Sequence, residues 1–549
     1  MQNAANTAET SATITSGVNE TNFISHLREL FSTSKVVLAE LMQNARRAGA
    51  TKVFFNFVDG DLTVTDDGCG IDDFQKLIVV AESGWSEEIM ASEQPFGIGF
   101  SSVSFSADRI VVASKGKSIG FSSEDLIAKR PIAVKPSTFI GGTRIELHGF
   151  KVPELDAIKS LRQFAMGFPI EVIAGGEALE RPHAIDALKG TQTEYGSIHI
   201  PGVHGDAEAY SDKAFLYCQG LPVKAGSLTS DYSRGPNSPV IHINHQRFKP
   251  RVPDRDVLID ADKADEALTG AIKALWRAHL IEDKSRLAPE VFAERYWHIA
   301  KILGCREVFN DVPVLPAKAM SYQADYPVIY NGNDSTIASY KKHLTRGEVE
   351  SGQVRLCYVL DEDLNHDSFA RIMFAQAKEF VYVEAGLPEG HWAIQHIVDL
   401  DEGELQISGE TLAEAFFDGR WTGGTVKLMK EIVVTLNGES ATLSDPVAVT
   451  EGPEDWSVIF HVPQGVDSAA YVLRQASIYQ DDNEDFQELA HDLDYDEFNN
   501  LVAIMAGEKP ESTLTKCLRE AGAKSKSNLH GKRFAVAFDA EGNYTVEVL

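Results

Sequence analysis

Between Ser34 and Ala45 the chain reads Ser-Lys-Val-Val-Leu-Ala-Glu-Leu-Met-Gln-Asn-Ala, and this stretch decides the fold. Its apolar residues recur at intervals of three and four, which predicts an amphipathic helix. We expect Ser34 to cap this helix and Gly49 to end it in the left-handed conformation. Glu40 and Asn44 are four residues apart, so they project from neighbouring turns of one side. A carboxylate and an amide oxygen placed in this way can hold a water molecule and Mg²⁺, although a solvated helix edge has the same spacing.

The residues that follow predict a β-hairpin that ends in a glycine-rich turn. Residues 52–65 combine two runs of strand-forming residues with an Asp-Gly pair between them, which is typical of a type I′ turn. The second run leads into Asp66, and Gly68 and Gly70 allow the backbone behind it to approach a ligand closely. A carboxylate there can accept a hydrogen bond from an exocyclic amine such as that of adenine. An ordinary Asp/Gly turn after a hairpin is the alternative.

A further pair of glycines, Gly97 and Gly99, precedes a short predicted helix over residues 100–105. Glycines before a helix N-terminus expose backbone N–H groups and the positive end of the helix dipole to phosphate. A loop with two glycines carries little weight alone. Residues 82–95, which precede this pair, are mixed in charge and predict a flexible segment.

Taken in order, these three segments resemble the nucleotide-binding boxes of the GHKL ATPases. That superfamily includes gyrase, the ninety-kilodalton heat-shock chaperones, sensor histidine kinases and MutL. The resemblance extends from Asn22 to Ile173, is greatest to the chaperone branch, and includes the segment Gly142-Thr143-Arg-Ile-Glu-Leu-His. It implies an α+β fold whose first domain is a Bergerat-type ATPase α/β sandwich, with helices on one face of an antiparallel sheet.

The resemblance also implies roles for individual residues. Glu40 would be the general base of ATP hydrolysis, and Asn44 would bind Mg²⁺. Asp66 would recognise adenine with support from Thr143. The implied cofactors are ATP and Mg²⁺, and the glycines that would line the nucleotide are Gly68, Gly70, Gly97 and Gly99.

Two residues depart from the family pattern. Arg47 stands three residues after the box asparagine, where family members usually carry Asp. Asp67 follows the adenine-binding position, where Asn is usual. Neither departure removes Glu40 or Asn44, so the expectation of hydrolysis stands. Arg47 leaves the subfamily and the rate of hydrolysis open.

A second domain is expected over residues 180–283, where strands are followed by a long helix over residues 262–281. This order is similar to the transducer-like α/β domain that follows the ATPase domain in gyrase, MutL and the chaperones. In the chaperones an arginine just before such a helix reaches the γ-phosphate. Arg255 is the best match and would act with Glu40 in catalysis, with Arg251 and Lys249 behind it. A salt bridge at a helix start is the alternative for Arg255.

Changes in residue composition and in the expected secondary structure define the other domain boundaries. These are a mobile N-terminal arm over residues 1–20, the ATP-binding domain over 21–179, an α/β region of unknown role over 284–421, and a C-terminal α/β subdomain over 422–549. We place the last break within residues 423–445. Asp492, Asp494 and Asp496 have the spacing of a metal site, but no accompanying motif supports one, so a solvated acidic face is expected.

Composition limits the class of protein. The 549 residues are 43% hydrophobic and 24% charged, as in a globular protein of two to four domains. The formal net charge of −30 disfavours broad attraction to nucleic acid or to an anionic membrane. The sequence contains no transmembrane or secretory pattern, and its five scattered cysteines fit free thiols in a reducing compartment. We therefore expect a cytoplasmic protein.

The resulting hypothesis is an ATP-binding, Mg²⁺-dependent ATPase that closes around its nucleotide to act on a macromolecular partner, as chaperones do. A protein client is the expected partner, and closure could join two copies into an ATP-dependent homodimer. Two alternatives remain open. One is a nucleotide-gated or catalytically inactive interaction protein, which Arg47 and the acidity allow. The other is a DNA-transaction ATPase of MutL type, against which the lack of a basic motif argues.

Overall fold

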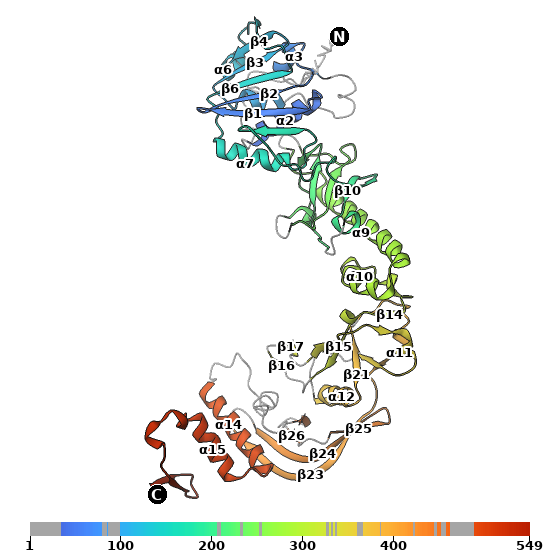
Figure 1. Ribbon diagram of the computed structural model, residues 1–549, viewed down its shortest axis with the longest axis vertical. Coiled ribbons are helices and arrows are strands. Elements are labelled where there is room, and N and C mark those ends of the chain that lie inside the picture. The colour runs from blue at the N-terminus through green and yellow to red at the C-terminus, as the bar shows by residue number, and fades with distance from the viewer. Residues whose placement is uncertain are drawn as a thin grey trace, which may run out of the picture. The chain divides into compact units, whose positions relative to one another are not determined.

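The computed structural model describes the greater part of the chain: residues 35–79, 85, 99–205, 210–230, 234–251, 255–324, 329–330, 333–334, 337–358, 366–384, 386–420, 423–443, 447–451, 457–461 and 488–549. The chain divides into two compact units, Met1–Glu282 and Asp283–Leu549 (Figure 1). The expected N-terminal arm, the Ser34 cap and Gly97 lie outside the described residues.

The first unit contains an eight-stranded sheet in the order β5-β4-β3-β6-β2-β1-β7-β8. Every neighbouring pair is antiparallel except β1 and β7, so the sheet is mixed where the resemblance implied an antiparallel one. The strands are β1 (Lys52–Val58), β2 (Asp61–Asp66), β3 (Arg109–Ser114), β4 (Lys117–Phe121), β5 (Lys135–Pro136), β6 (Thr143–His148), β7 (Glu171–Ala174) and β8 (Glu177–Ala178).

The hairpin predicted over residues 52–65 is confirmed as β1 and β2. Asp59 and Gly60 join the two strands with φ values of 50° and 86°, and a type I′ turn needs a positive φ at both positions. Side chains along β1 alternate, with Val53 and Phe55 buried between more exposed neighbours. One face of the sheet is therefore covered and the other meets solvent.

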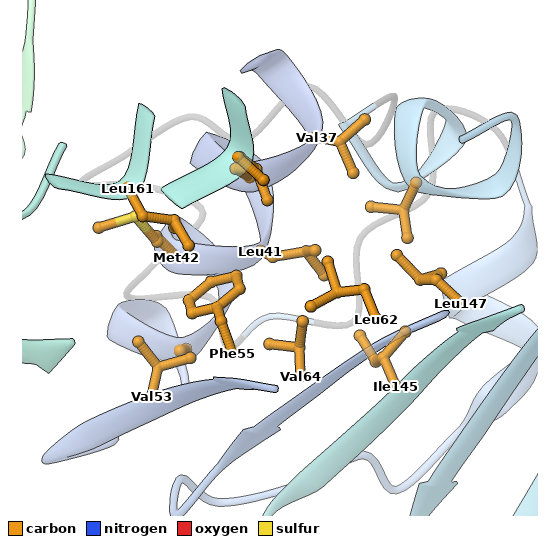
Figure 2. Packing of buried hydrophobic residues seen from close by; sticks show 14 of the residues in the cluster. Val37, Leu41, Met42, Val53, Phe55, Leu62, Val64, Ile145, Leu147 and Leu161 are labelled. Carbon is orange, nitrogen blue, oxygen red and sulfur yellow. The ribbon is translucent and has the colours of Figure 1, made fainter. Parts of the chain in front are cut away.

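Helices cover the buried face. The apolar side of α2 lies on the strands, and Figure 2 shows Leu41 and Met42 above Phe55 and Val64, in a cluster that also includes Val37. Burying side chains of this size contributes about 1.5–3 kcal/mol each. This arrangement of sheet and helices confirms the expected α+β class. The helices of this part are α2 (Lys35–Arg47), α3 (Phe74–Ile78), α5 (Gly99–Ser104), α6 (Ser123–Ile127) and α7 (Glu154–Ala165).

A smaller sheet and the greater part of a long helix complete the first unit. The sheet has the order β12-β11-β13-β10-β9. The long helix predicted over residues 262–281 is α9 (Ala261–Arg286), which is 26 residues long. The other elements are β9 (Thr191–Thr193), β10 (Gly196–His199), α8 (Pro201–His204), β11 (Phe215–Cys218), β12 (Leu221–Pro222) and β13 (Val240–Ile243).

Three partly buried histidines lie around this smaller sheet. His183 Nδ1 is 2.7 Å from the Tyr217 hydroxyl oxygen, and His242 Nε2 is 2.7 Å from the His183 carbonyl oxygen. The rings of Tyr217 and His242 are stacked, with centroids 5.2 Å apart. Burial lowers the pKa of His183 to about 4, and it also lowers the pKa values of His204 and His242.

We expect the free energy of unfolding to decrease as the pH falls from 6.5, the ordinary histidine pKa, to about 4. In that interval the unfolded histidines bind protons that the folded ones exclude, so acid favours the unfolded state; above it the stabilisation is complete. His183 alone should account for about 1–2 kcal/mol, after allowance for the solvent screening of a partly exposed ring. Urea unfolding at about pH 7.5 and about pH 5 measures the change.

Two variants isolate the contribution of His183. His183→Gln retains a hydrogen-bonding side chain but does not titrate, so its stability should depend less on pH. His298→Gln replaces an exposed histidine of α10 and should behave as the wild type does. Identical pH dependence in His183→Gln and the wild type would show that this ring does not carry the effect.

The second unit begins with helix α10 and a five-stranded sheet in the order β18-β15-β21-β20-β22. β20 and β21 are parallel, and α12 lies between them along the chain. The elements are α10 (Pro289–Leu303), β14 (Val314–Leu315), β15 (Met320–Gln323), β16 (Ile329–Tyr330), β17 (Asn333–Asp334), β18 (Ile337–Ser339), β19 (Leu344–Thr345), α11 (Arg346–Glu350), β20 (Arg355–Tyr358), α12 (His366–Ala377), β21 (Phe380–Val383) and β22 (Ile397–Asp399).

A second five-stranded sheet follows, and it overturns the break that we expected within residues 423–445. Those residues hold β24, whose Ile432 and Val434 are fully buried. β24 pairs with β23 across the expected boundary at residue 422, and Asn437-Gly438 is only the turn into β25. The strands are β23 (Leu405–Asp418), β24 (Gly423–Leu436), β25 (Glu439–Leu443), β26 (Val447–Glu451) and β27 (Ser457–His461).

The C-terminal part contains α14 (Glu488–Met505), α15 (Pro510–Glu520) and a hairpin of β28 (Phe534–Phe538) and β29 (Tyr544–Val548). The expectation that Asp494 lies on a solvated face is wrong. Asp494 is 4% exposed and accepts a hydrogen bond from the Arg420 N–H at 2.9 Å. Among the helices described, none is long and apolar enough to cross a membrane.

Candidate functional site

The turn after β2 is attached to the C-terminal end of α2. The Cys69 N–H donates to the Ala48 carbonyl oxygen at 2.9 Å. Gly68 leaves no room for a side chain, since a Cβ there would lie 2.6 Å from Ala48 Cβ. Asp67 accepts the Thr51 N–H at 2.8 Å, and the hydrogen bond from the Thr51 hydroxyl lowers the pKa of Asp67. The departure from the family pattern at Asp67 thus has a structural role beside the turn.

Asp66 is held from two sides. It ends β2 directly opposite Thr143, the first residue of β6. The N–H and hydroxyl of Thr143 both hydrogen-bond to Asp66, and the Gly68 N–H donates to Asp66 Oδ1 at 2.9 Å. Burial raises the pKa of Asp66, and these hydrogen bonds oppose the rise. The result is a half-buried carboxylate in a set orientation, which suits it to accept a hydrogen bond from a ligand.

Small residues and a buried serine shape the surroundings of Asp66. A Cβ on Gly142 would overlap the Asp66 carbonyl oxygen, and a Cβ on Gly70 would lie 2.6 Å from Ser114 Oγ. The Ser114 hydroxyl accepts the Ile71 N–H at 2.9 Å and donates to the Gly142 carbonyl oxygen at 2.6 Å. The sequence analysis missed Ser114, because its role depends on β3 and β6 being neighbours in the sheet and no local signal marks it.

The first and third predicted segments meet at Glu40 and Gly99. Gly99 is the first residue of α5, and a Cβ there would overlap the Glu40 carboxylate. The Glu40 side chain is 13% exposed. Asn44 lies one turn farther along α2 and is partly buried. The structure therefore brings Glu40 to the start of α5, with Asn44 one turn away on α2, and it describes no position for Gly97.

Arg47 projects from the same side of α2 as Glu40, two turns away. Its Nη1 lies 3.8 Å from Glu40 Oε1, and its side chain is 1% exposed. A buried positive charge thus stands beside the predicted base, at the position where the family usually carries Asp. The spacing of seven residues indicates this proximity, but only the structure shows that both side chains are enclosed.

Arg255 lies on a turn next to the smaller, five-stranded sheet of the first unit. Its φ of 55° is unusual for a residue with a side chain, and its N–H donates to the Arg251 carbonyl oxygen at 2.8 Å. The Lys224 N–H donates to the Asp256 carbonyl oxygen at 2.7 Å, which ties the turn to the segment after β12. Arg255 is therefore attached to the smaller sheet, whereas Asp66 ends a strand of the larger sheet.

A hydrogen bond nevertheless connects α2 with the smaller sheet. Gln43 is buried, and its Nε2 donates to the Gln219 carbonyl oxygen at 3.0 Å. Gln219 and Gly220 form the turn between β11 and β12, with φ values of 52° and 85°. The helix that carries Glu40 and Asn44 is thus joined directly to the neighbouring sheet, a contact that the sequence did not indicate.

The side chains present fit a magnesium ion that is held mainly by a nucleotide. Asn44 offers one amide oxygen, and Glu40 offers a nearby carboxylate. Within the described ranges no group of three or more His, Cys, Asp or Glu side chains could form a metal site of its own. Mg²⁺ usually keeps several waters and takes its other ligands from substrate phosphates, so one protein oxygen is sufficient.

No protein-family model matches the chain, and no curated protein matches it. Among solved structures, one described as the crystal structure of the N-terminal domain of a DNA repair protein matches 49% of this chain and 99% of its own length. The identity is 13% and the TM-score is 0.30. A match at that TM-score supports neither a fold nor a function.

Proposed function

We propose that the chain is a GHKL ATPase with a Bergerat-type ATP-binding domain over residues 21–179. The observation that carries the proposal is the placement of Asp66. It is oriented by Thr143 and Gly68, and its turn is attached to the helix that bears Glu40 and Asn44. The second segment contacts α2 at Ala48 and the third contacts it at Glu40. In residue types and order the three segments resemble the three GHKL boxes.

In this proposal ATP lies along α2, with adenine at Asp66 and the phosphates towards α5. Asp66 accepts a hydrogen bond from the adenine amine. The backbone N–H groups at the start of α5, beginning at Gly99, face the phosphates. Asn44 would hold Mg²⁺, which neutralises phosphate charge when bound. Glu40 takes the proton from the attacking water.

A second candidate function is a nucleotide-gated interaction protein that hydrolyses ATP slowly or not at all. The ion pair between Arg47 and Glu40 favours it, because a buried guanidinium competes with water for the carboxylate. Calorimetry with ATP, and phosphate release with Mg²⁺ or with a chelator, separate the two candidates. Binding with Mg²⁺-dependent release supports the ATPase, binding without release supports the second candidate, and absence of binding overturns both.

The Arg47–Glu40 pair leads to a specific expectation. Arg47→Met removes the charge and keeps a long apolar side chain in the buried position. With the cation gone, both Glu40 oxygens can engage water, so turnover at saturating ATP should rise at least about two- to fivefold, since an exposed ion pair is worth up to ~1 kcal/mol and an enclosed pair interacts more strongly. Phosphate release per folded molecule, with the folded fraction taken from circular dichroism, measures this.

The neighbouring Arg46 supplies the control. Its Nε donates to Gln43 Oε1 at 2.8 Å, and Arg46→Met should leave turnover near the wild-type value. A lower turnover in folded Arg47→Met would mean that Arg47 supports Glu40, contrary to the competition proposed here.

We further propose that ATP closes the two sheets of the first unit around the γ-phosphate, with Arg255 as the contact from the second sheet. The Gln43–Gln219 hydrogen bond already joins α2 to that sheet, so a change at α2 has a direct route to it. A protein client and an ATP-dependent homodimer belong to this chaperone-like mechanism. A cytoplasmic location suits it, since all five cysteines are free thiols.

Closure predicts that a non-hydrolysable ATP analogue gives a more compact or dimeric species than ADP does. ADP lacks the γ-phosphate and cannot favour the closed state through it. Arg255→Ala should abolish the difference and leave adenine binding intact, whereas Arg251→Ala, at an exposed position of the same turn, should preserve it. Sedimentation velocity measures the species. Identical profiles in the two nucleotides for the wild type would rule out this closure.

A further inference from the structure

The C-terminal end of the chain forms a small module in which no residue is buried. We define the C-terminal module as residues 510–549, drawn in the darkest red in Figure 1. It contains α15, two short 3-10 helices (Ala523–Ser525 and Ser527–Leu529), β28 and β29. The open end of its hairpin is joined by a hydrogen bond from the Leu549 N–H to the Arg533 carbonyl oxygen at 2.9 Å. An isolated two-stranded hairpin is at best marginally stable in water, so a partner for this exposed surface is expected.

The charges of this module are unevenly placed: it holds six Lys and Arg residues and five Asp and Glu residues, and the cations are grouped in one segment. The whole chain has a formal net charge of −30, but between residues 516 and 533 it holds six Lys and Arg residues against a single Glu. We call residues 516–533 the basic segment. All six cations are exposed, and among the described residues no carboxylate pairs with the last four of them. The six are Lys516, Arg519, Lys524, Lys526, Lys532 and Arg533.

The hairpin that follows the basic segment has one wholly apolar face. Residues directly opposite each other in an antiparallel pair lie on the same face of the sheet. Phe538 and Tyr544 end this face, 59% and 67% exposed, with ring centroids 5.8 Å apart. The opposed pairs that make up the face are Phe534 with Val548, Val536 with Val546, and Phe538 with Tyr544.

We propose that the C-terminal module binds single-stranded nucleic acid, with phosphates at the basic segment and bases stacked on Phe538 and Tyr544. A locally basic surface on an acidic protein attracts a polyanion to that surface alone. Exposed aromatic rings stack on bases of any sequence, and in a single strand the faces of the bases are accessible. The strands of the hairpin are about 17 Å long, which gives room for a few stacked bases.

Two other partners fit the same surface less well. A second copy of the chain could cover the apolar face, but its net charge of −30 repels a like-charged copy at long range. An anionic bilayer could use both features, but Asp539 and Glu541 lie in the hairpin turn beside the aromatic pair. Those carboxylates would be pressed against anionic headgroups if the tip inserted. A single strand that runs from the basic segment to the tip keeps most of its phosphates beside the cations, and only the nucleotides stacked on the aromatic pair approach these carboxylates.

Fluorescence anisotropy of the full chain with a labelled oligothymidine of about 16 nucleotides tests the proposal. Binding should weaken as salt is raised. A four-cation variant replaces Lys524, Lys526, Lys532 and Arg533 with Gln. Its affinity should be at least about tenfold lower. The slope of log affinity against log salt concentration should become shallower by about three, because each lost phosphate contact reduces it by about 0.7. Phe538→Ala with Tyr544→Ala should lower affinity about tenfold and leave the salt slope unchanged.

A charge-matched control replaces four exposed lysines of the first unit, Lys135, Lys159, Lys263 and Lys273, with Gln, and it should bind as the wild type does. Circular dichroism of each variant establishes that the fold is retained. No binding up to about 50 µM protein at about 50 mM salt overturns the proposal, as does equal binding by the wild type and the four-cation variant. Anionic phospholipid vesicles that bind while the oligonucleotide does not would identify a membrane surface. A self-interface would be identified by a different result. The wild type would form a dimer without nucleic acid and would not bind the oligonucleotide, and Phe538→Ala with Tyr544→Ala would abolish the dimer.

Discussion

Glu40→Ala should retain ATP binding and lose about 100-fold or more in turnover at saturating ATP and Mg²⁺, which is the usual contribution of a general base. The Glu40 side chain projects from α2 against Gly99, the first residue of α5, and is 13% exposed. Few other groups can therefore receive the proton of an attacking water there. Phosphate release and calorimetry on the same samples separate loss of chemistry from loss of binding.

Two comparisons sharpen this expectation. Asn44→Ala should weaken the Mg²⁺-dependent part of ATP binding, because it removes the amide oxygen one turn away. Glu154→Ala removes an exposed carboxylate at the start of α7 and should change neither turnover nor binding. If Glu40→Ala hydrolyses ATP at the wild-type rate, Glu40 is not the base and the mechanism must use another group.

Asp66→Asn should lower ATP affinity about tenfold or more, since an unpaired polar group in a half-buried site costs about 1–3 kcal/mol. The carboxylate accepts hydrogen bonds from Gly68 and Thr143 and should accept another from the adenine amine. An asparagine replaces one acceptor oxygen with an NH₂ donor, which then faces a donor on the protein or on the ligand. Calorimetry with ATP measures the loss.

The adjacent residue provides a control with the same chemical change. Asp67 accepts its hydrogen bonds from the backbone N–H groups of Thr51 and Lys52 and from the Thr51 hydroxyl, at the junction of α2 and β1. Asp67→Asn should therefore leave ATP affinity close to the wild-type value while lowering thermal stability. Equal ATP affinity in Asp66→Asn and the wild type would remove adenine recognition from Asp66.

Elements whose signals are local could be predicted from the sequence. The β1–β2 hairpin follows from alternating side chains and an Asp-Gly pair, and α2 ends at Gly49 with φ of 68°, as a glycine after a helix predicts. The long helix α9 was also predicted, over residues 262–281. β23 was missed because most of its side chains are exposed, so no apolar alternation marks it. Its strand geometry depends on pairing with β24.

For the candidate site too, some residues could be predicted from the sequence and others could not. Residue types and spacing along the chain pointed to Glu40, Asn44, Asp66 and Gly99, and their roles with ATP stay a prediction. The sequence by itself determined these local choices, since helix period, strand alternation and turn chemistry act between near neighbours.

The tertiary structure decided which distant groups meet. It places Thr143 beside Asp66 and Ser114 beside Gly142, and it encloses Arg47 with Glu40. It also buries Asp494, which the sequence placed on a solvated face. Burial and strand order depend on how the sheets and helices pack, and contacts between segments far apart along the chain have no period in the sequence to indicate them.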